Sequence, residues 1–303
     1  MQQRPFKQVD VFTATPYFGN PLAVVLDGSG LDDAAMQRFA RWTNLSETTF
    51  VLPPAQSTAD YRLRIFTPGG ELPFAGHPTL GSCHAWIEAG GQPKGTEFIV
   101  QECAKGLINI RRDVANAHLA FAAPSLMRST PSAEVLAQTA NALGISTAHI
   151  TAAQLLDNGP MWLGLLLDSP DTVLQIQPNH QDMAKLGIKV GVAGAYATPS
   201  SLLITKANRE AKAFAQKHPG FEPDLEVRAF AACLGVNEDP VTGSLNASLA
   251  QWLMAEGLMP TFYAASQGVC IDRAGQVYLE RDSHGQVWVG GQSVTCINGE
   301  VTL

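Results

Sequence analysis

A segment without charged side chains, residues 79–87 (TLGSCHAWI), constrains the fold of this chain more than any other. It follows a glycine turn at Gly76 and His77, and Pro78 suits the first turn of a helix, where an N–H has no intrahelical partner. A helix with no charged face has no side to present to water, so we expect it to be buried all round. Its free N–H groups would form a site for a carboxylate or another anion.

The second half of the chain repeats this arrangement around Gly243. The repeat pairs three turn residues of each half: Pro73 with Pro240, Gly76 with Gly243, and Gly90 with Gly257. Ser244 then takes the position of His77, and the helix expected over residues 245–255 again lacks charged side chains. Strands of similar pattern, LRIF and VRAF, precede the two turns. We infer a duplicated unit and expect both helix starts to open into one cleft between the halves.

Short strands and glycine turns dominate the rest of the sequence. Amphipathic helices are expected at residues 31–42 and 133–143, and the expected strands include 161–167, 200–205 and 269–271. Long helices do not alternate regularly with strands, which argues against a doubly wound parallel sheet. A buried helix among strands indicates an α+β fold of two similar barrel-like halves, each a rolled, mostly antiparallel sheet around a central helix. We expect one half at residues 1–125, completed by strands near 290–303, and the other at residues 126–289.

Composition excludes several classes of protein. The 303 residues allow two domains of about 150 each, and the net charge of −7 disfavours nucleic acid and anionic membranes as partners. No apolar run approaches about 18 residues, and the N-terminal segment lacks the apolar core of a signal peptide. The five cysteines are scattered in apolar contexts without a CxxC pair, as in reduced proteins with packing thiols rather than disulfides or zinc sites. We therefore expect a cytoplasmic protein without a bound metal.

Six positions could carry chemistry: Glu47, His77 and Asp239 as catalytic groups, and Gly76, Gly243 and Ser244 as substrate-binding groups. Ordinary structural roles compete with this interpretation, such as a solvated loop acid for Glu47, a helix-end residue for His77 and a turn residue for Asp239. Position favours function, because His77 and Ser244 occupy equivalent helix starts and Asp239 lies one turn from Ser244. If the halves face each other, these groups would hold a small carboxylate, and Glu47 would supply the acid or base.

Sequence motifs for common cofactors are missing. The chain has no Walker A sequence, no GxGxxG after a strand, no HExxH and no GxSxG elbow. Cys83 and His84 are adjacent on the expected helix and point apart, so they are poor joint metal ligands. We expect no cofactor.

At several of these positions the chain resembles the PhzF-like isomerases of phenazine biosynthesis, which share the diaminopimelate epimerase fold. The matching stretches are residues 9–12, 19–21, 44–48, 66–68, 71–81 and 238–244, and Gln267-Gly268 followed by Arg273. They extend to about residue 290 and so cover nearly the whole chain. The Ser-Glu-Thr, Ala-Gly-His-Pro-Thr and Asp-Pro-Val-Thr-Gly-Ser stretches together are highly specific.

The resemblance implies a cofactor-free isomerase, usually a homodimer, acting on a small carboxylic acid. In the phenazine enzyme the family glutamate, which matches Glu47, moves a proton along a dihydro-hydroxyanthranilate. The family's histidine and aspartate match His77 and Asp239, and its Gly-Ser pair matches Gly243 and Ser244. Related epimerases and racemases place a cysteine in each glycine loop, and neither loop of this chain has one.

These observations predict an isomerase in which Glu47 acts first as base and then as acid, while the helix starts anchor the substrate carboxylate. Two alternatives stay open. The chain could be an amino-acid or imino-acid epimerase or racemase with another second base. It could also be a binding or regulatory protein that kept the fold and lost turnover.

Overall fold

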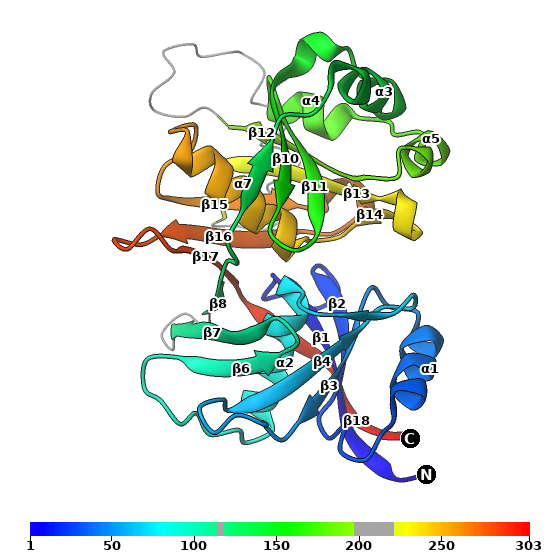
Figure 1. The fold of residues 1–303 in the computed structure, drawn as a ribbon, viewed down its shortest axis with the longest axis vertical. Coiled ribbons are helices and arrows are strands. Elements are labelled where there is room, and N and C mark those ends of the chain that lie inside the picture. Colours follow the sequence, from blue (N-terminus) through cyan, green and yellow to red (C-terminus); the bar gives the residue numbers. More distant parts are fainter. Residues whose placement is uncertain (114–117, 197–220) are drawn as a thin grey trace. The chain divides into compact units, whose positions relative to one another are not determined.

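A computed structural model describes residues 1–113, 118–196 and 221–303, whose course is shown in Figure 1. The described residues divide into two compact units. Unit 1 contains Met1–Ala122 and Gly290–Leu303, and unit 2 contains Ala123–Val289. The strand expected at residues 200–205 lies outside the described residues.

Unit 1 combines a mostly antiparallel sheet with the helices α1 and α2. Its elements are β1 (Gln3–Val11), β2 (Asn20–Val25), α1 (Asp33–Thr43), β3 (Thr48–Leu52), β4 (Tyr61–Phe66), β5 (Glu71–Leu72), α2 (Gly76–Glu88), β6 (Ile99–Cys103), β7 (Gly106–Asp113), β8 (His118–Ala122) and β18 (Ser293–Thr302). The parallel pairs are β2–β3 and β4–β6. β18 joins the sheet by antiparallel pairing with β1, from Gln3 opposite Thr302 to Val11 opposite Ser293.

Unit 2 has the same mixture of strands and a larger set of helices. Its elements are β9 (Met127–Ser129), α3 (Ala133–Leu143), η1 (Thr147–His149), β10 (Ile150–Asp157), β11 (Met161–Leu167), α4 (Pro170–Gln175), α5 (His180–Lys185), β12 (Lys189–Ala195), β13 (Leu225–Ala231), η2 (Ala232–Leu234), β14 (Val236–Asp239), α7 (Gly243–Ala255), β15 (Phe262–Gln267), η3 (Val269–Ile271), β16 (Gly275–Arg281) and β17 (Val287–Gly291), which runs on into unit 1. The parallel pairs are β11–β12 and β13–β15.

One order of strand pairing is repeated in the two units. An antiparallel hairpin (β1–β2, β10–β11) gains a parallel neighbour (β3, β12), and an antiparallel strand follows (β4, β13) with a short partner (β5, β14). The central helix comes next (α2, α7), and then a parallel strand (β6, β15) with its antiparallel successor (β7, β16). The expected α+β fold of two similar halves is therefore confirmed.

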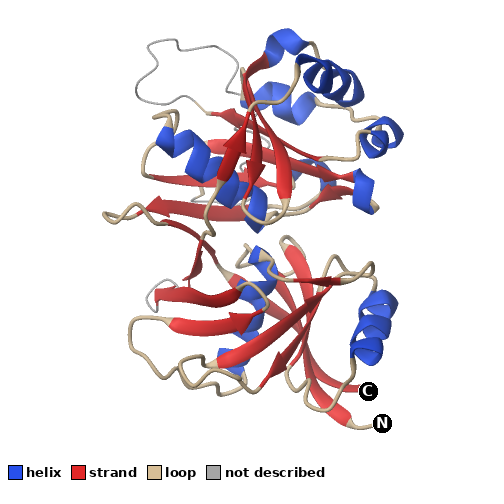
Figure 2. Ribbon diagram, in the orientation of Figure 1, coloured by secondary structure: helices blue, strands red, loops and turns tan. Residues whose placement is uncertain are grey.

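The central helix of each unit is buried by strands (Figure 2). In unit 1, α2 contacts β1, β2, β3, β4, β8 and β18, and Gly81 permits close packing, because a Cβ there would lie 2.7 Å from side-chain atoms of Leu22 and Val11. In unit 2, α7 contacts β10, β11 and β16, and Trp252 is its largest fully buried side chain. The absence of charge from residues 79–87 of α2 and from all of α7 reflects this burial.

A pair of arginine–glutamate contacts also repeats, just before each central helix. Arg64 on β4 donates from Nε and Nη2 to the two carboxylate oxygens of Glu71 on β5, at 2.8 and 2.6 Å. Arg228 on β13 donates from the same atoms to Glu238 on β14, at 3.0 and 2.8 Å. Each guanidinium also lies about 5 Å from the ring of the phenylalanine two residues on. These bidentate contacts fix the strand that enters each glycine turn.

The structure differs from the expected elements mainly at turns. Residues 269–271 form the 3₁₀ helix η3 rather than a strand, because Gly268 and Asp272 on either side adopt left-handed backbone conformations. The central helices begin at Gly76 and Gly243 themselves, a few residues earlier than expected. None of the helices in the described residues is long and apolar enough to cross a membrane.

Candidate functional site

In unit 1, His77 and Glu47 face each other. His77 lies in the first turn of α2, and Glu47 directly precedes β3. Nε2 of His77 is 3.3 Å from Oε2 of Glu47, and the two side chains are only 6% and 15% exposed. Glu47 is therefore a largely buried acid beside an imidazole, and the interpretation of it as a solvated loop carboxylate does not hold.

Hydroxyl groups beside Glu47 fix the strand that carries it. Oγ1 of Thr49 on β3 donates to the backbone carbonyl of Ala23 on β2 and lies 2.8 Å from Oγ of Ser82 on α2. Both hydroxyls are buried. These contacts tie the start of β3 to β2 and α2, so they hold Glu47 in place relative to His77.

A buried amide contacts the other ring nitrogen of His77. Asn20, the first residue of β2, places Nδ2 3.3 Å from Nδ1 of His77. Burial lowers the pKa of His77 to about 3, so the imidazole is neutral at physiological pH. His77 therefore places a neutral ring, not a positive charge, beside Glu47.

In unit 2, Gln267 holds the turn that carries Asp239. The Asp239 carboxylate accepts a hydrogen bond from Oγ1 of Thr242 at 2.6 Å. Nε2 of the buried Gln267 donates to the Asp239 backbone carbonyl and to Oγ1 of Thr242, both at 3.0 Å. Its Oε1 accepts from the Thr242 backbone N–H at 3.0 Å and from Asn246 Nδ2 at 2.8 Å. One buried side chain thus joins both ends of the turn.

Ser244, in the first turn of α7, is oriented by two residues of unit 2. Nε1 of Trp162 donates to the Ser244 hydroxyl oxygen at 3.2 Å, and Nδ2 of Asn158 donates to the Ser244 backbone carbonyl at 3.0 Å. Because the hydroxyl oxygen is the acceptor in the first contact, its own O–H stays available as a donor.

The two central helices differ from the outer helices in how they begin. A side-chain oxygen accepts from a first-turn N–H at the start of four outer helices: Asp32 for α1, Ser132 for α3, Ser169 for α4 and Asn179 for α5. The residues at the start of α2 and α7, Ala75 and Thr242, make no such hydrogen bond. The N–H groups of these two helix starts therefore have no side-chain cap and can serve an external acceptor.

The structure distributes the six expected site residues over the two units. Unit 1 holds Glu47, Gly76 and His77, and unit 2 holds Asp239, Gly243 and Ser244. Asn20, Thr242 and Gln267 make direct contacts with these residues and were not expected there. Asn20 and Gln267 do lie in stretches that carry the family resemblance, yet only the fold shows which residues their amides contact.

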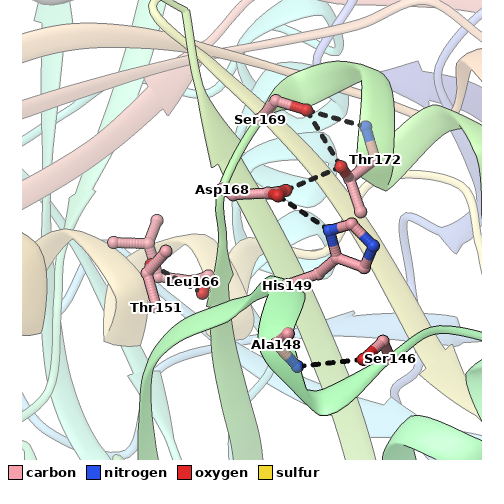
Figure 3. A network of polar contacts seen from close by, with 8 residues as sticks. All are labelled: Ser146, Ala148, His149, Thr151, Leu166, Asp168, Ser169 and Thr172. Atoms are coloured by element: carbon pink, nitrogen blue, oxygen red, sulfur yellow. Dashed lines mark hydrogen bonds and ion pairs between the residues drawn. The ribbon is translucent and has the colours of Figure 1, made fainter.

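A second histidine–carboxylate pair lies on the surface of unit 2 (Figure 3). Nδ1 of His149 is 2.7 Å from Oδ2 of Asp168, and the side chains are 46% and 41% exposed. The other carboxylate oxygen of Asp168 accepts from Oγ1 of Thr172 at 2.7 Å, next to the Ser169 cap of α4. This pair is solvated and secures the start of a helix, so it is a structural contact and not a competing site.

The thiols among the described residues differ in exposure. Cys83 and Cys103 are buried, whereas Cys270 is exposed, so the expectation that every thiol is a packing residue is wrong for Cys270. No group of three His, Cys, Asp or Glu side chains in residues 1–113, 118–196 and 221–303 could hold a metal ion.

Comparison with known proteins gives consistent matches over the whole chain. Residues 9–299 match a family model described as phenazine biosynthesis-like protein. A Schizosaccharomyces pombe protein named antisense-enhancing sequence 1 is 35% identical over 318 residues, covering 99% of each chain. The trans-2,3-dihydro-3-hydroxyanthranilate isomerase of Pseudomonas fluorescens is 31% identical over 304 residues, covering 97% of this chain and 98% of that protein. The crystal structure of a Bacillus anthracis phenazine biosynthesis protein of the PhzF family superposes with a TM-score of 0.80 at 21% identity, covering 100% of both chains, which shows a common fold.

Proposed function

Since this chain belongs to the phenazine biosynthesis-like family and is an isomerase, we propose that it moves one proton within a small carboxylic acid and that Glu47 carries the proton. Glu47 takes a proton from a carbon of the substrate and returns it to another carbon. The substrate electrons shift between the two positions, so no oxidant or reductant is needed.

The contact between Glu47 and the neutral His77 is the observation that carries this proposal. A carboxylate that is 15% exposed and 3.3 Å from an imidazole nitrogen is held in one position and is poorly solvated. Both conditions favour a general base, because orientation and partial desolvation increase its effectiveness toward a carbon acid. The sequence departs from the two-thiol racemases at this point, since Gly76 is followed by His77 and Gly243 by Ser244.

We further propose that the uncapped starts of α2 and α7 bind the substrate carboxylate. The backbone N–H groups at Gly76 and Gly243 and the hydroxyl of Ser244 are the donors, and Asp239 positions a polar group of the substrate. Anions bind readily where helix N–H groups lack partners.

The substrate that we propose to test first is trans-2,3-dihydro-3-hydroxyanthranilate, after the name of the Pseudomonas fluorescens relative. Cyclic and aromatic carboxylates form the wider set for a thermal-shift screen, because a ligand that binds the folded state raises its stability. We also propose a cytoplasmic homodimer that acts without a cofactor, and light scattering on the purified protein measures the oligomeric state.

The proposal is tested by Glu47→Gln, which keeps the size of the side chain and removes the base. The assay uses a substrate that the wild type isomerises, in D₂O, and follows deuterium incorporation by NMR. We expect the variant to bind ligand normally and its rate of isomerisation to fall about 10²–10⁴-fold or more. Asp239→Asn serves as the comparison and should weaken binding as well as rate. Turnover of Glu47→Gln at the wild-type rate would show that Glu47 is not the proton carrier. Full binding without any turnover by the wild type would favour the binding-protein alternative.

A further inference from the structure

The amide of Asn20 contacts His77 from inside unit 1, on the side opposite Glu47. Asn20 is fully buried and follows Gly19, where a Cβ would lie 2.3 Å from the backbone oxygen of Val11, so no larger residue fits at Gly19. The Gly19 N–H also donates to the carboxylate of Asp10 at 3.3 Å. The turn before β2 is therefore fixed, and it holds the Asn20 amide against the ring of His77.

The two contacts of His77 together select one form of its ring. A neutral imidazole has one N–H donor and one nitrogen acceptor. Nδ1 lies 3.3 Å from the amide nitrogen of Asn20, which can only donate, so Nδ1 is the acceptor and the proton is on Nε2. Nε2 in turn lies 3.3 Å from Oε2 of Glu47. The opposite tautomer would place a ring lone pair beside this oxygen, which is ionised when Glu47 acts as the base of the proposed function, so both neighbours then favour the same form.

We propose that Asn20 is a positioning residue that holds His77 as the neutral tautomer with its proton on Nε2, the ring nitrogen 3.3 Å from Oε2 of Glu47. The inference rests on the proposed function for its catalytic meaning. In this form His77 neither takes nor gives the moving proton, and it presents an N–H rather than a ring lone pair on the side of Glu47, 3.3 Å from Oε2. Asn20 thus determines, through His77, whether an N–H or a ring lone pair lies beside Oε2 of Glu47.

Unit 2 contains an asparagine that provides a matched control. Asn158 is buried and donates from Nδ2 to the backbone carbonyl of Ser244, the residue equivalent to His77 in the repeat. A backbone carbonyl has no tautomers, so Asn158 can fix a helix start and cannot select a protonation state. Replacement of Asn158 removes a similar buried hydrogen bond without touching the ring of His77.

The tautomer is measured directly by long-range ¹H–¹⁵N NMR of protein labelled at its seven histidines. Protonated and unprotonated ring nitrogens resonate in separate ranges, and the signals of His77 are identified by their loss in His77→Gln. We expect Nδ1 unprotonated and Nε2 protonated from about pH 5 to 8, because the pKa of His77 lies near 3. A wild-type spectrum with a proton on Nδ1 at neutral pH overturns the proposal without any variant.

The variant Asn20→Asp keeps the shape of the side chain and replaces the amide donor by an oxygen acceptor. Nδ1 should then become protonated, either in the opposite tautomer or in an imidazolium between two carboxylates. Asn158→Asp should leave the His77 signals unchanged. An unchanged His77 spectrum in Asn20→Asp, or an equal change in Asn158→Asp, refutes selection by Asn20.

Kinetics separate this inference from the proposed function. Since Asn20 does not touch the substrate in our assignment, Asn20→Asp should lower kcat by about 10²-fold, the usual effect of misplacing a catalytic group, with KM nearly unchanged. A switched tautomer with full turnover would leave the selection by Asn20 intact and refute its role in catalysis. Full activity of Glu47→Gln would instead refute the proposed function, and the NMR result would stand by itself.

Discussion

The repeated arginine–glutamate contact allows a stability prediction in which one unit serves as the control for the other. Glu238→Gln keeps the shape of the side chain and removes its charge. Arg228 and Glu238 are 5% and 6% exposed, and Nη1 of Arg228 is already occupied by the backbone carbonyls of Val173 and Ile176. The variant would leave a buried guanidinium without its carboxylate. Breaking a buried pair in this way costs about 3–5 kcal/mol of the free energy of unfolding.

The equivalent change in unit 1, Glu71→Gln, should cost much less. The side chains of Arg64 and Glu71 are 15% and 37% exposed, so water can solvate the arginine that loses its partner. Arg64 also keeps a second carboxylate, since its Nη1 lies 2.7 Å from Oδ1 of Asp33. For an exposed pair we expect a loss of about 1 kcal/mol or less. The predicted difference between the two variants is therefore at least about 2 kcal/mol.

Hydrogen exchange in a urea series, read by mass spectrometry, measures the two units separately through peptides from β4–β5 and β13–β14. With a urea dependence of about 2–3 kcal/mol per molar, Glu238→Gln should lower the midpoint of unit 2 by roughly 1–2 M. The double variant Arg228→Met with Glu238→Leu should recover much of this loss, because it leaves no unpaired charge. Equal losses for Glu71→Gln and Glu238→Gln would refute the argument from burial.

Two further predictions concern titrating groups. Burial raises the pKa of Glu226 to about 8 from an ordinary value of 4.5, so between these pH values the folded chain holds a proton that the unfolded chain has released, and the free energy of unfolding falls as pH rises. In the wild type, the free energy of unfolding should fall by at most about 1.4 kcal/mol per pH unit from this group, and Glu226→Gln should remove that slope. The measurement is urea unfolding at several pH values. The same pH dependence in variant and wild type would contradict the prediction. Alkylation should modify the exposed Cys270 first and spare Cys83, whose pKa burial raises to about 12, with turnover largely intact. If alkylation abolished turnover and bound substrate prevented this loss, a racemase that uses two thiols would have to be considered again.

The sequence was most informative where a pattern reports burial. The charge-free stretches that contain Leu80 and Leu249 can only be enclosed helices, and the matched turns around them predict a duplicated fold. An apolar pattern also located the strand β11, which was expected at residues 161–167. Elements such as β12, rich in glycine and alanine, carry no strong pattern, because close packing rather than side-chain type determines their conformation.

The candidate site was predictable as a set of residues and not as a set of contacts. Glu47 and His77 stand out by position, but their separation of 3.3 Å depends on how β3 packs against α2. Asn20 and Gln267 have no charge, and an amide can satisfy a buried turn anywhere in a protein. Their importance comes from the partners that the fold gives them, which no local spacing encodes.

Unit 1 is built from two separate segments of the sequence, and this affects how the chain folds during translation. β1 lies between β2 and β18, and all of unit 2 is translated before β18. The edge of β1 that pairs with β18 therefore stays open while the ribosome synthesises unit 2. Strands of unit 2 could pair with this edge in the meantime. Open strand edges favour misassociation, and pairing over so long a separation is slow. Unit 2 should thus fold first on the ribosome, and Glu47 and its neighbours in unit 1 should be the last to become protected from proteases.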